Sequence, residues 1–80
     1  MPVDSLGVKL RRLRSEYKLS REDLSGLASI HISQLSNYEL DITYPSPKVL
    51  IRLSVVFDVS MDELTNDLRQ DYLQRTSNVH

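Results

Sequence analysis

The chain contains no cysteine and no long apolar segment. Without cysteine, no disulfide can staple the fold and no thiolate can hold a structural metal ion. No apolar run approaches the ~20 residues of a membrane-spanning helix, and the N-terminus lacks the apolar core of a signal peptide. We therefore expect a soluble, cytoplasmic protein with no membrane partner, no cofactor and no metal.

Residues suited to catalysis are also scarce. The two histidines are His31 and His80, and no glycine-rich loop is present to cradle phosphates. The adjacent acids Glu22–Asp23 and Asp62–Glu63 fall at expected helix N-termini, where carboxylates interact favourably with the helix dipole. The sequence therefore predicts a protein that is not an enzyme.

Charge is unevenly distributed along the 80 residues, which suffice for one small domain. Residues 1–21 hold six bases and two acids, a local charge of +4, whereas residues 22–80 hold four bases and nine acids, or −5, which together give the formal −1. A basic end on an acidic body can meet phosphate locally. A solvated basic helix face that binds nothing explains the charge equally well.

Apolar residues recur every three or four positions, and no sustained alternation suggests a strand. In the first expected helix, over residues 4–17, Lys9, Arg11 and Arg12 lie off the apolar stripe. Capping signals at Ser20 and Ser46 start the second and fourth helices. We expect helices over 4–17, from 20 to about 28, over 32–39, from 46 to about 57, and from 61 into the seventies, with a frayed tail over 76–80.

The stretch from Leu19 to Glu39, LSREDLSGLASIHISQLSNYE, strongly resembles the helix-turn-helix of the Cro and phage-repressor family, the XRE-like regulators. The matching elements are Leu-Ser, Glu-Asp-Leu, an Ala-Ser-Ile turn and Leu-Ser-x-Tyr-Glu, and the likeness covers roughly residues 6–64. It implies an all-α, compact five-helix bundle of the phage-repressor DNA-binding-domain type. Helices two and three would form the helix-turn-helix at about 20–39, within one domain over 1–75. The expected partner is double-stranded DNA, in a prokaryotic or phage setting.

In the third expected helix, Leu35 and Tyr38 face inward. The resemblance places base reading on Ile32, Ser33, Gln34 and Asn37. Asparagine and glutamine suit bidentate bonds to adenine, serine can bond either edge, and isoleucine can touch a thymine methyl. The alternative is that these residues are simply the polar surface of a short helix.

Phosphate contacts are expected at helix starts and in the loop after the third helix. Arg21 begins the second helix, where it would bind phosphate. The alternatives are a solvated arginine and an ion pair within the same helix. The loop Leu40–Tyr44 carries no positive charge, and Asp41 repels phosphate while tolerating left-handed backbone. His31 stands at the third helix's cap, either filling it or making a pH-sensitive phosphate contact. The expected phosphate-contacting residues are Arg11, Arg21, Ser36, Thr43 and Tyr44.

The resemblance also implies a largely buried ion pair between Arg14 and Glu39, joining the first helix to the end of the third. Its role would be orientation.

A homodimer is expected because one copy has too small an interface for useful specificity. The alternative is that the fifth helix folds back, through Leu68, Tyr72 and Leu73, and covers the apolar residues within one subunit. The candidate dimer-interface residues are Leu40, Ile42, Ile51, Val55 and Met61, with Val49 nearby.

The sequence thus favours a dimeric repressor or autoregulatory controller that reads a palindromic operator, with no room for a small-molecule ligand domain. The rival is a protein-interaction module with the same fold, such as an antitoxin or the partner of another regulator.

Overall fold

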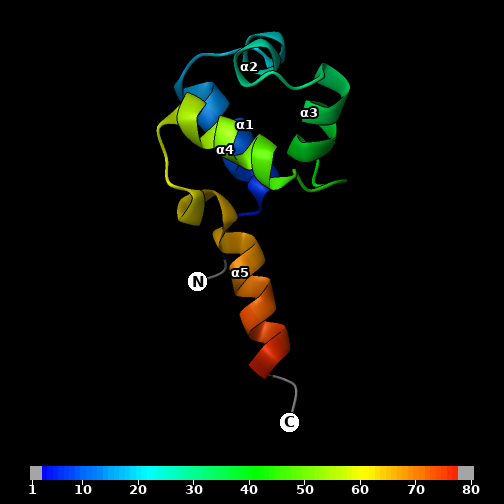
Figure 1. Cartoon of the computed structure of the whole chain (residues 1–80), viewed down its shortest axis with the longest axis vertical. Coiled ribbons are helices and arrows are strands. Elements are labelled where there is room, and N and C mark those ends of the chain that lie inside the picture. The colour runs from blue at the N-terminus through cyan, green and yellow to red at the C-terminus, as the bar shows by residue number, and fades with distance from the viewer. Residues whose placement is uncertain (1–2, 78–80) are drawn as a thin grey trace.

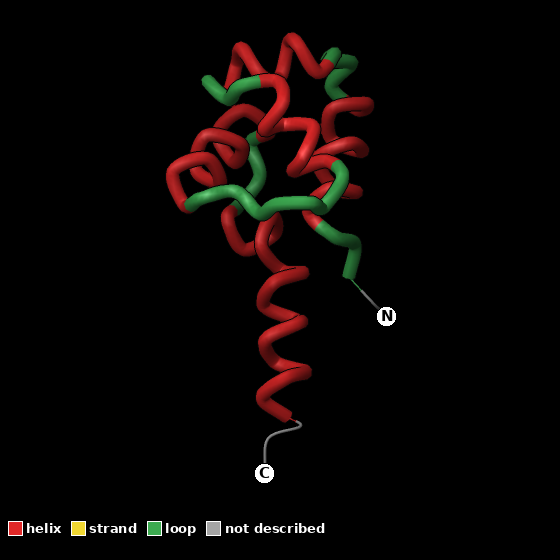
Figure 2. The backbone as a smooth tube through the Cα atoms, turned by 90° about the vertical axis from the view of Figure 1, so that its right-hand side faces the viewer, coloured by secondary structure: helices red, strands yellow, loops and turns green. Residues whose placement is uncertain are grey.

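The structure, a computed structural model, describes residues 3–77, which form five helices and, within that range, no strand (Figures 1 and 2). The predicted all-α class is confirmed, and the helix boundaries agree with expectation to within about two residues. Among the described residues, no helix combines the length and apolar character needed to cross a bilayer. The helices are α1 (Leu6–Glu16), α2 (Arg21–Ala28), α3 (Ile32–Glu39), α4 (Pro47–Phe57) and α5 (Met61–Ser77).

Serine side chains fix where most of the helices begin. Ser5, Ser20 and Ser46 each accept a hydrogen bond from the backbone N–H three residues on, which satisfies a donor that the helix itself cannot pair. At α2 the bond is reciprocated by Asp23, so the predicted capping box is complete. Because Ser5 is a cap, α1 starts at Leu6 and not at residue 4.

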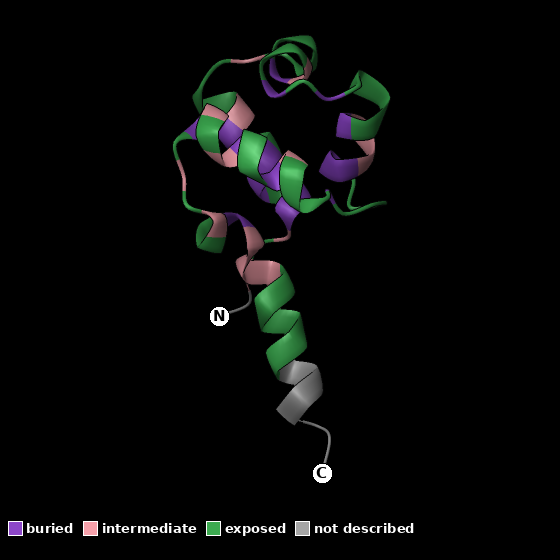
Figure 3. Cartoon of the chain, in the orientation of Figure 1, coloured by how far each residue is buried: buried purple, intermediate pink, exposed green. Residues whose placement is uncertain are grey.

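The core lies where the apolar stripes of the helices meet, and Figure 3 shows the buried faces turned inward. In α3 the inward apolar residues are Leu35 and Tyr38, as predicted, and Glu39 at its end is buried as well, which leaves the first turn of this short helix to face outward. Each fully buried leucine contributes about 1.5–3 kcal/mol of transfer free energy. The core consists of Leu6, Leu10, Leu13, Leu24, Ala28, Ile30, Leu35, Tyr38, Leu50, Leu53, Phe57 and Leu64.

Gly7 permits an unusually close approach of α1 to the end of α3. A Cβ atom at this position would lie 2.5 Å from the carbonyl oxygen of Glu39 and 2.8 Å from the carboxylate of Asp41. Both distances are shorter than real Cβ contacts, so any other residue would push the two helices apart. Nothing in the local sequence distinguishes this glycine from others in helices.

Helix α5 has its last fully buried residue, among those whose burial is described, at Leu64, and beyond Asp67 it projects away from the other helices (Figure 1). The described chain is correspondingly elongated, with extents of 46 × 21 × 19 Å. Leu68, Tyr72 and Leu73 are at least half exposed. The alternative in which α5 folds back to cover the apolar surface of the subunit is therefore wrong. The helix includes residues 76 and 77 of the expected frayed tail, and 78–80 lie outside the described residues.

Candidate nucleic-acid interface

Helices α2 and α3 are joined by a three-residue turn that is held rigidly. Ser29 adopts the left-handed conformation, with φ of 55°, and Ile30 is buried in the core. The backbone N–H of Ile30 bonds to the carbonyl oxygen of Ser25 at 2.9 Å, which closes the end of α2. The turn therefore fixes the direction in which α3 leaves α2.

The outward face of α3 is polar at its first turn. Ile32 is 37% exposed, and Ser33 and Gln34 are exposed beside it. Asn37, at the far end of the helix, is half-buried, as is Ser36. The structure thus brings three of the four expected base-reading residues to an open surface and leaves Asn37 at its edge.

His31 fills the N-cap of α3 with its side chain. Its Nδ1 lies 3.3 Å from the backbone nitrogen of Ser33 and 2.8 Å from the Ser33 hydroxyl. The backbone bond requires Nδ1 to accept, so the cap depends on a ring that is unprotonated at this nitrogen. His31 therefore orients Ser33 as well as capping the helix.

A buried carboxylate ties α1, α2 and α3 together. Glu39 is fully buried, and Arg14 contacts it through Nε at 2.8 Å and Nη2 at 3.2 Å. The Nε of Arg21 lies 3.0 Å from the same carboxylate. Arg21 is therefore neither solely solvated nor paired within its own helix, which were the two alternatives to a phosphate contact. With its side chain 44% exposed, Arg21 is still partly accessible at the surface.

The acidic residue in the loop after α3 has a structural partner. Asp41 has φ of 58°, consistent with the predicted left-handed backbone, and its carboxylate accepts bonds from the Ser5 hydroxyl at 2.7 Å and the Gly7 N–H at 2.9 Å. It therefore acts as a second cap on α1, where the helix dipole favours negative charge.

Tyr44, at the end of that loop, is exposed and directs its hydroxyl to Asp67 of α5. The hydroxyl donates to Asp67 at 3.2 Å. Partial burial, reinforced by the negative charge of Asp67, raises the pKa of Tyr44 well above its ordinary value, so the hydroxyl stays protonated. Because a phenol has one proton to donate, the expected donation from Tyr44 to phosphate conflicts with this bond.

Lys9 does not contribute to a basic surface. Its side chain is buried against α5, where its ammonium bonds to the carbonyl oxygens of Glu63 at 3.1 Å and Leu64 at 3.3 Å, and to the side-chain oxygen of Asn66. Burial lowers the pKa of Lys9, against the attraction of Asp67. The helical spacing correctly placed Lys9 off the leucine stripe, but it gave no sign that α5 covers that side.

Other basic residues of α1 remain at the surface. Arg11 is exposed, with one bond of 3.4 Å from its Nε to the Gly7 carbonyl oxygen. Arg12 is paired with Asp4 at 2.9 Å. Among the expected phosphate contacts, Arg11, Arg21 and the exposed Thr43 are therefore the most accessible.

The expected dimer residues differ in accessibility. Val55 is 73% exposed and Ile51, one turn earlier on α4, is also exposed. Leu40 and Ile42 are exposed on the loop after α3. Met61, by contrast, is partly buried against the core, so little of it is available to a second copy.

Two short helices joined by a tight turn, the second with an outward polar face, define a helix-turn-helix protein of phage-repressor type. The profile of the helix-turn-helix domain family matches residues 7–67, and the chain belongs to this family.

Solved structures agree with this assignment. SinR from Bacillus subtilis, a master regulator for biofilm formation solved in complex with DNA, is 32% identical, with a TM-score of 0.69 over 74% of this chain and 95% of that one. The restriction-modification controller protein C.AhdI from Aeromonas hydrophila is 29% identical, with a TM-score of 0.69 over 74% and 89%. The P22 c2 repressor, solved with a synthetic operator, shares the fold at 24% identity, with a TM-score of 0.73 over 78% and 94%. No curated protein matches the chain.

Proposed function

We propose that this chain is a sequence-specific, double-stranded DNA-binding transcriptional regulator that inserts α3 into the major groove and catalyses no reaction. The main support is the open first turn of α3, where Ile32 and the polar Ser33 and Gln34 are exposed, while Leu35 and Tyr38 on the inner face of the helix pack in the core. Its similarity to SinR, which was solved bound to DNA, supports the same function.

Base reading is assigned to Ile32, Ser33, Gln34 and Asn37. Gln34 offers a bidentate amide to adenine, and a contact of this kind discriminates bases by ~1–3 kcal/mol. Ser33 is oriented by His31, so it contacts a base with little loss of side-chain freedom. Asn37, half-buried, reaches only a base that the groove brings close to the end of α3.

Phosphate binding is assigned to Arg11, Arg21, Ser36 and Thr43. Arg21 stands at the N-terminus of α2, where backbone N–H groups also attract anions. The loop after α3 supplies no positive charge, and Lys9 is buried, so few cations face the phosphates. We therefore expect modest affinity for one copy and a shallow dependence on salt.

Dimerisation would raise this affinity. Ile51 and Val55 form an exposed apolar strip on α4, and Leu40 and Ile42 add apolar surface from the loop after α3. Two copies related by a two-fold axis would read a palindromic operator with half-sites about one helical turn apart, as suits a repressor or autoregulatory controller. Equilibrium sedimentation at tens of micromolar tests this step, and a purely monomeric protein would refute it.

The function is tested by selecting bound sequences from a random pool of duplexes and then titrating the selected site with salt. Gln34→Ala should relax preference at one base position, whereas Arg21→Ala should weaken all sites alike. Arg69→Ala is the matched control, because it removes the same charge from the exposed outer part of α5. The absence of any selected sequence, and of binding at ~50 mM salt, would refute the proposal.

A protein-interaction module is the second candidate, and the outer part of α5 favours it. Leu68, Tyr72 and Leu73 expose apolar surface on a helix that projects from the body. If this were the sole role, the protein would show no DNA binding at low salt. In either case, partner binding would be lost on Leu68→Asp but retained on Gln34→Ala. The two roles are compatible in one molecule.

A further inference from the structure

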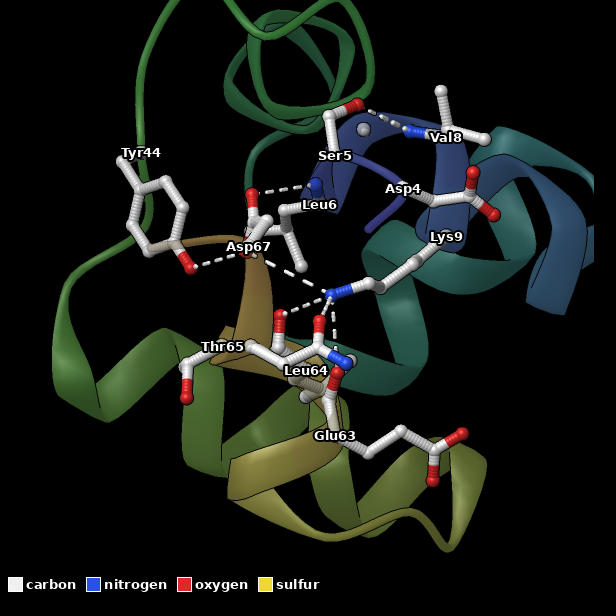
Figure 4. Close-up of polar contacts among 12 residues, drawn as sticks. Asp4, Ser5, Leu6, Val8, Lys9, Tyr44, Glu63, Leu64, Thr65 and Asp67 are labelled. Atoms are coloured by element: carbon white, nitrogen blue, oxygen red, sulfur yellow. Dashed lines mark hydrogen bonds and ion pairs between the residues drawn. The ribbon is translucent and has the colours of Figure 1, made fainter. Parts of the chain in front are cut away.

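Asp67 receives bonds from two separate parts of the fold. One carboxylate oxygen, Oδ2, accepts the backbone N–H of Leu6 at 2.9 Å, and the other, Oδ1, accepts the hydroxyl of Tyr44 at 3.2 Å. The ammonium of Lys9 lies 3.7 Å from Oδ1. Figure 4 shows these groups converging from α1 and from the loop after α3 onto one side chain of α5.

Asp67 lies at the point along α5 where the helix passes from the body to the exposed projecting part. Leu64 is fully buried, Asp67 is half-buried, and from Leu68 onward the described side chains are exposed. Asp67 therefore belongs to the last turn of α5 that is fastened to the body. Its side chain is the link between that turn and the loop that follows α3.

The same loop is held at a second point. Asp41 caps α1 through the Gly7 N–H at 2.9 Å, one residue from the amide that Asp67 caps. The first turn of α1 thus carries two carboxylates, one from the loop and one from α5, both of which the helix dipole stabilises. The segment 41–44 is therefore held at both of its ends. Asp41 bonds directly to the start of α1, and Tyr44 bonds to Asp67, which also contacts the start of α1.

We propose that Asp67 is a positioning residue for DNA recognition: it holds Tyr44, and with it the segment 40–45, against the start of α1, so that the backbone beside α3 is already ordered when DNA arrives. The inference rests on the proposed function. It differs from the family resemblance in assigning the Tyr44 hydroxyl to Asp67 instead of phosphate. An ordered segment loses less conformational entropy on binding, so affinity depends on the bond between Tyr44 and Asp67.

A double-mutant cycle of Tyr44→Phe and Asp67→Ala, measured as DNA affinity on the selected site, tests the assignment. Tyr44→Phe removes only the hydroxyl and leaves the contacts of Asp67 with α1 in place. Alanine at position 67 leaves no side-chain oxygen that could accept the hydroxyl. We expect Tyr44→Phe to weaken binding about five- to tenfold, the effect of ordering roughly one residue, and to weaken it no further once Asp67→Ala is present. If the hydroxyl instead contacts phosphate, the effects of the two substitutions on affinity will multiply, which would overturn the proposal.

Tyr17→Phe is the control for a loss of overall stability. It also removes one tyrosine hydroxyl from a hydrogen bond, here of 2.7 Å to the carbonyl oxygen of Phe57, far along the chain from the segment 40–45. We expect Tyr17→Phe to lower stability and leave DNA affinity within twofold of wild type at a temperature where both proteins are folded. If Tyr17→Phe and Tyr44→Phe weaken DNA binding equally, the contact with Asp67 contributes only to overall stability, and the positioning role is overturned.

Hydrogen exchange without DNA separates this inference from the proposed function. The amides of Ile42 and Thr43 bond to the carbonyl oxygen of Asn37 at 2.9 and 3.5 Å and should exchange about tenfold faster in Asp67→Ala. The amide of Leu53 in the core should change no more than global stability requires. If the wild type binds DNA but the exchange rates of Ile42 and Thr43 are unchanged in the variant, the positioning role is overturned and the proposed function stands. If the wild type binds no DNA, both the proposed function and the positioning role are overturned. This holds even if faster exchange in the variant shows that Asp67 holds the segment 40–45.

Discussion

Glu39 allows a quantitative test of how the helix-turn-helix is held. The carboxylate is fully buried and is shared by Arg14, with two bonds, and Arg21, with one. The perturbation is to replace the arginines by methionine, singly and together, which keeps much of the apolar stem and removes the charge.

The expected losses follow from what remains around the carboxylate. Removing one partner of a buried ion pair costs about 3–5 kcal/mol when the other charge is left alone. Arg14→Met leaves Arg21 in contact, so we expect a loss of about 2 kcal/mol. Arg21→Met removes one bond from a side chain that is 44% exposed, which should cost only about 0.5–1 kcal/mol. Together they strand Glu39, so the double variant should lose about 4–5 kcal/mol, more than the two single losses combined.

Urea unfolding followed by far-UV circular dichroism at ~15 °C, near the usual maximum of stability, measures these free energies. A triple variant that adds Glu39→Met serves as the control, because replacing the whole ionic cluster by apolar side chains should restore stability to within about 1–2 kcal/mol of wild type. The reasoning is refuted if the double variant loses no more than the single variants combined, or if the triple variant is no more stable than the double.

Three further outcomes are expected from thermal or urea unfolding. Gly7→Ala should cost about 1–3 kcal/mol because the added carbon collides with backbone, whereas Gly26→Ala, with no atom within 4 Å, should gain about 0.5–1 kcal/mol, and equal effects would argue against the close helix approach. The backbone N–H of Ser20 lowers the pKa of Asp23, so the stability it contributes is present above about pH 4 and is lost as pH falls through the lower folded-state pKa. The difference in Tm between wild type and Asp23→Asn should therefore shrink as pH falls through that lowered pKa, and a constant difference would exclude this linkage. Tyr17→Phe should cost about 0.5–1.5 kcal/mol, the net contribution of one hydrogen bond, and an unchanged free energy would mean that water replaces it.

Local signals were sufficient to predict most of the fold. Ser20 and Ser46 predicted where α2 and α4 begin because an N-cap acts within three residues of itself. Leu35 and Tyr38 were correctly assigned to the inner face of α3, since helical periodicity determines which side chains share a side. The resemblance supplied the order of the helices, which periodicity alone does not determine.

The contacts that the sequence did not reveal join residues far apart in the chain. Asp67 bonds to the N–H of Leu6, 61 positions away, and no spacing rule connects the two. Lys9 was counted among the basic surface residues because nothing in its own helix indicates that α5 covers it. Gly7 has the sequence context of an ordinary helix glycine, and only the position of the end of α3 in the fold shows that no Cβ fits there. Which base each residue of α3 contacts remains a prediction.

The direction of α5 has a consequence for how many molecules the protein can engage at once. The projecting turns leave the body at the end opposite α2 and α3, along the 46 Å axis (Figure 1). A duplex seated on α3 therefore leaves those turns open to solvent. A protein that bound those turns would therefore remain with the DNA complex instead of competing with the DNA for the same surface.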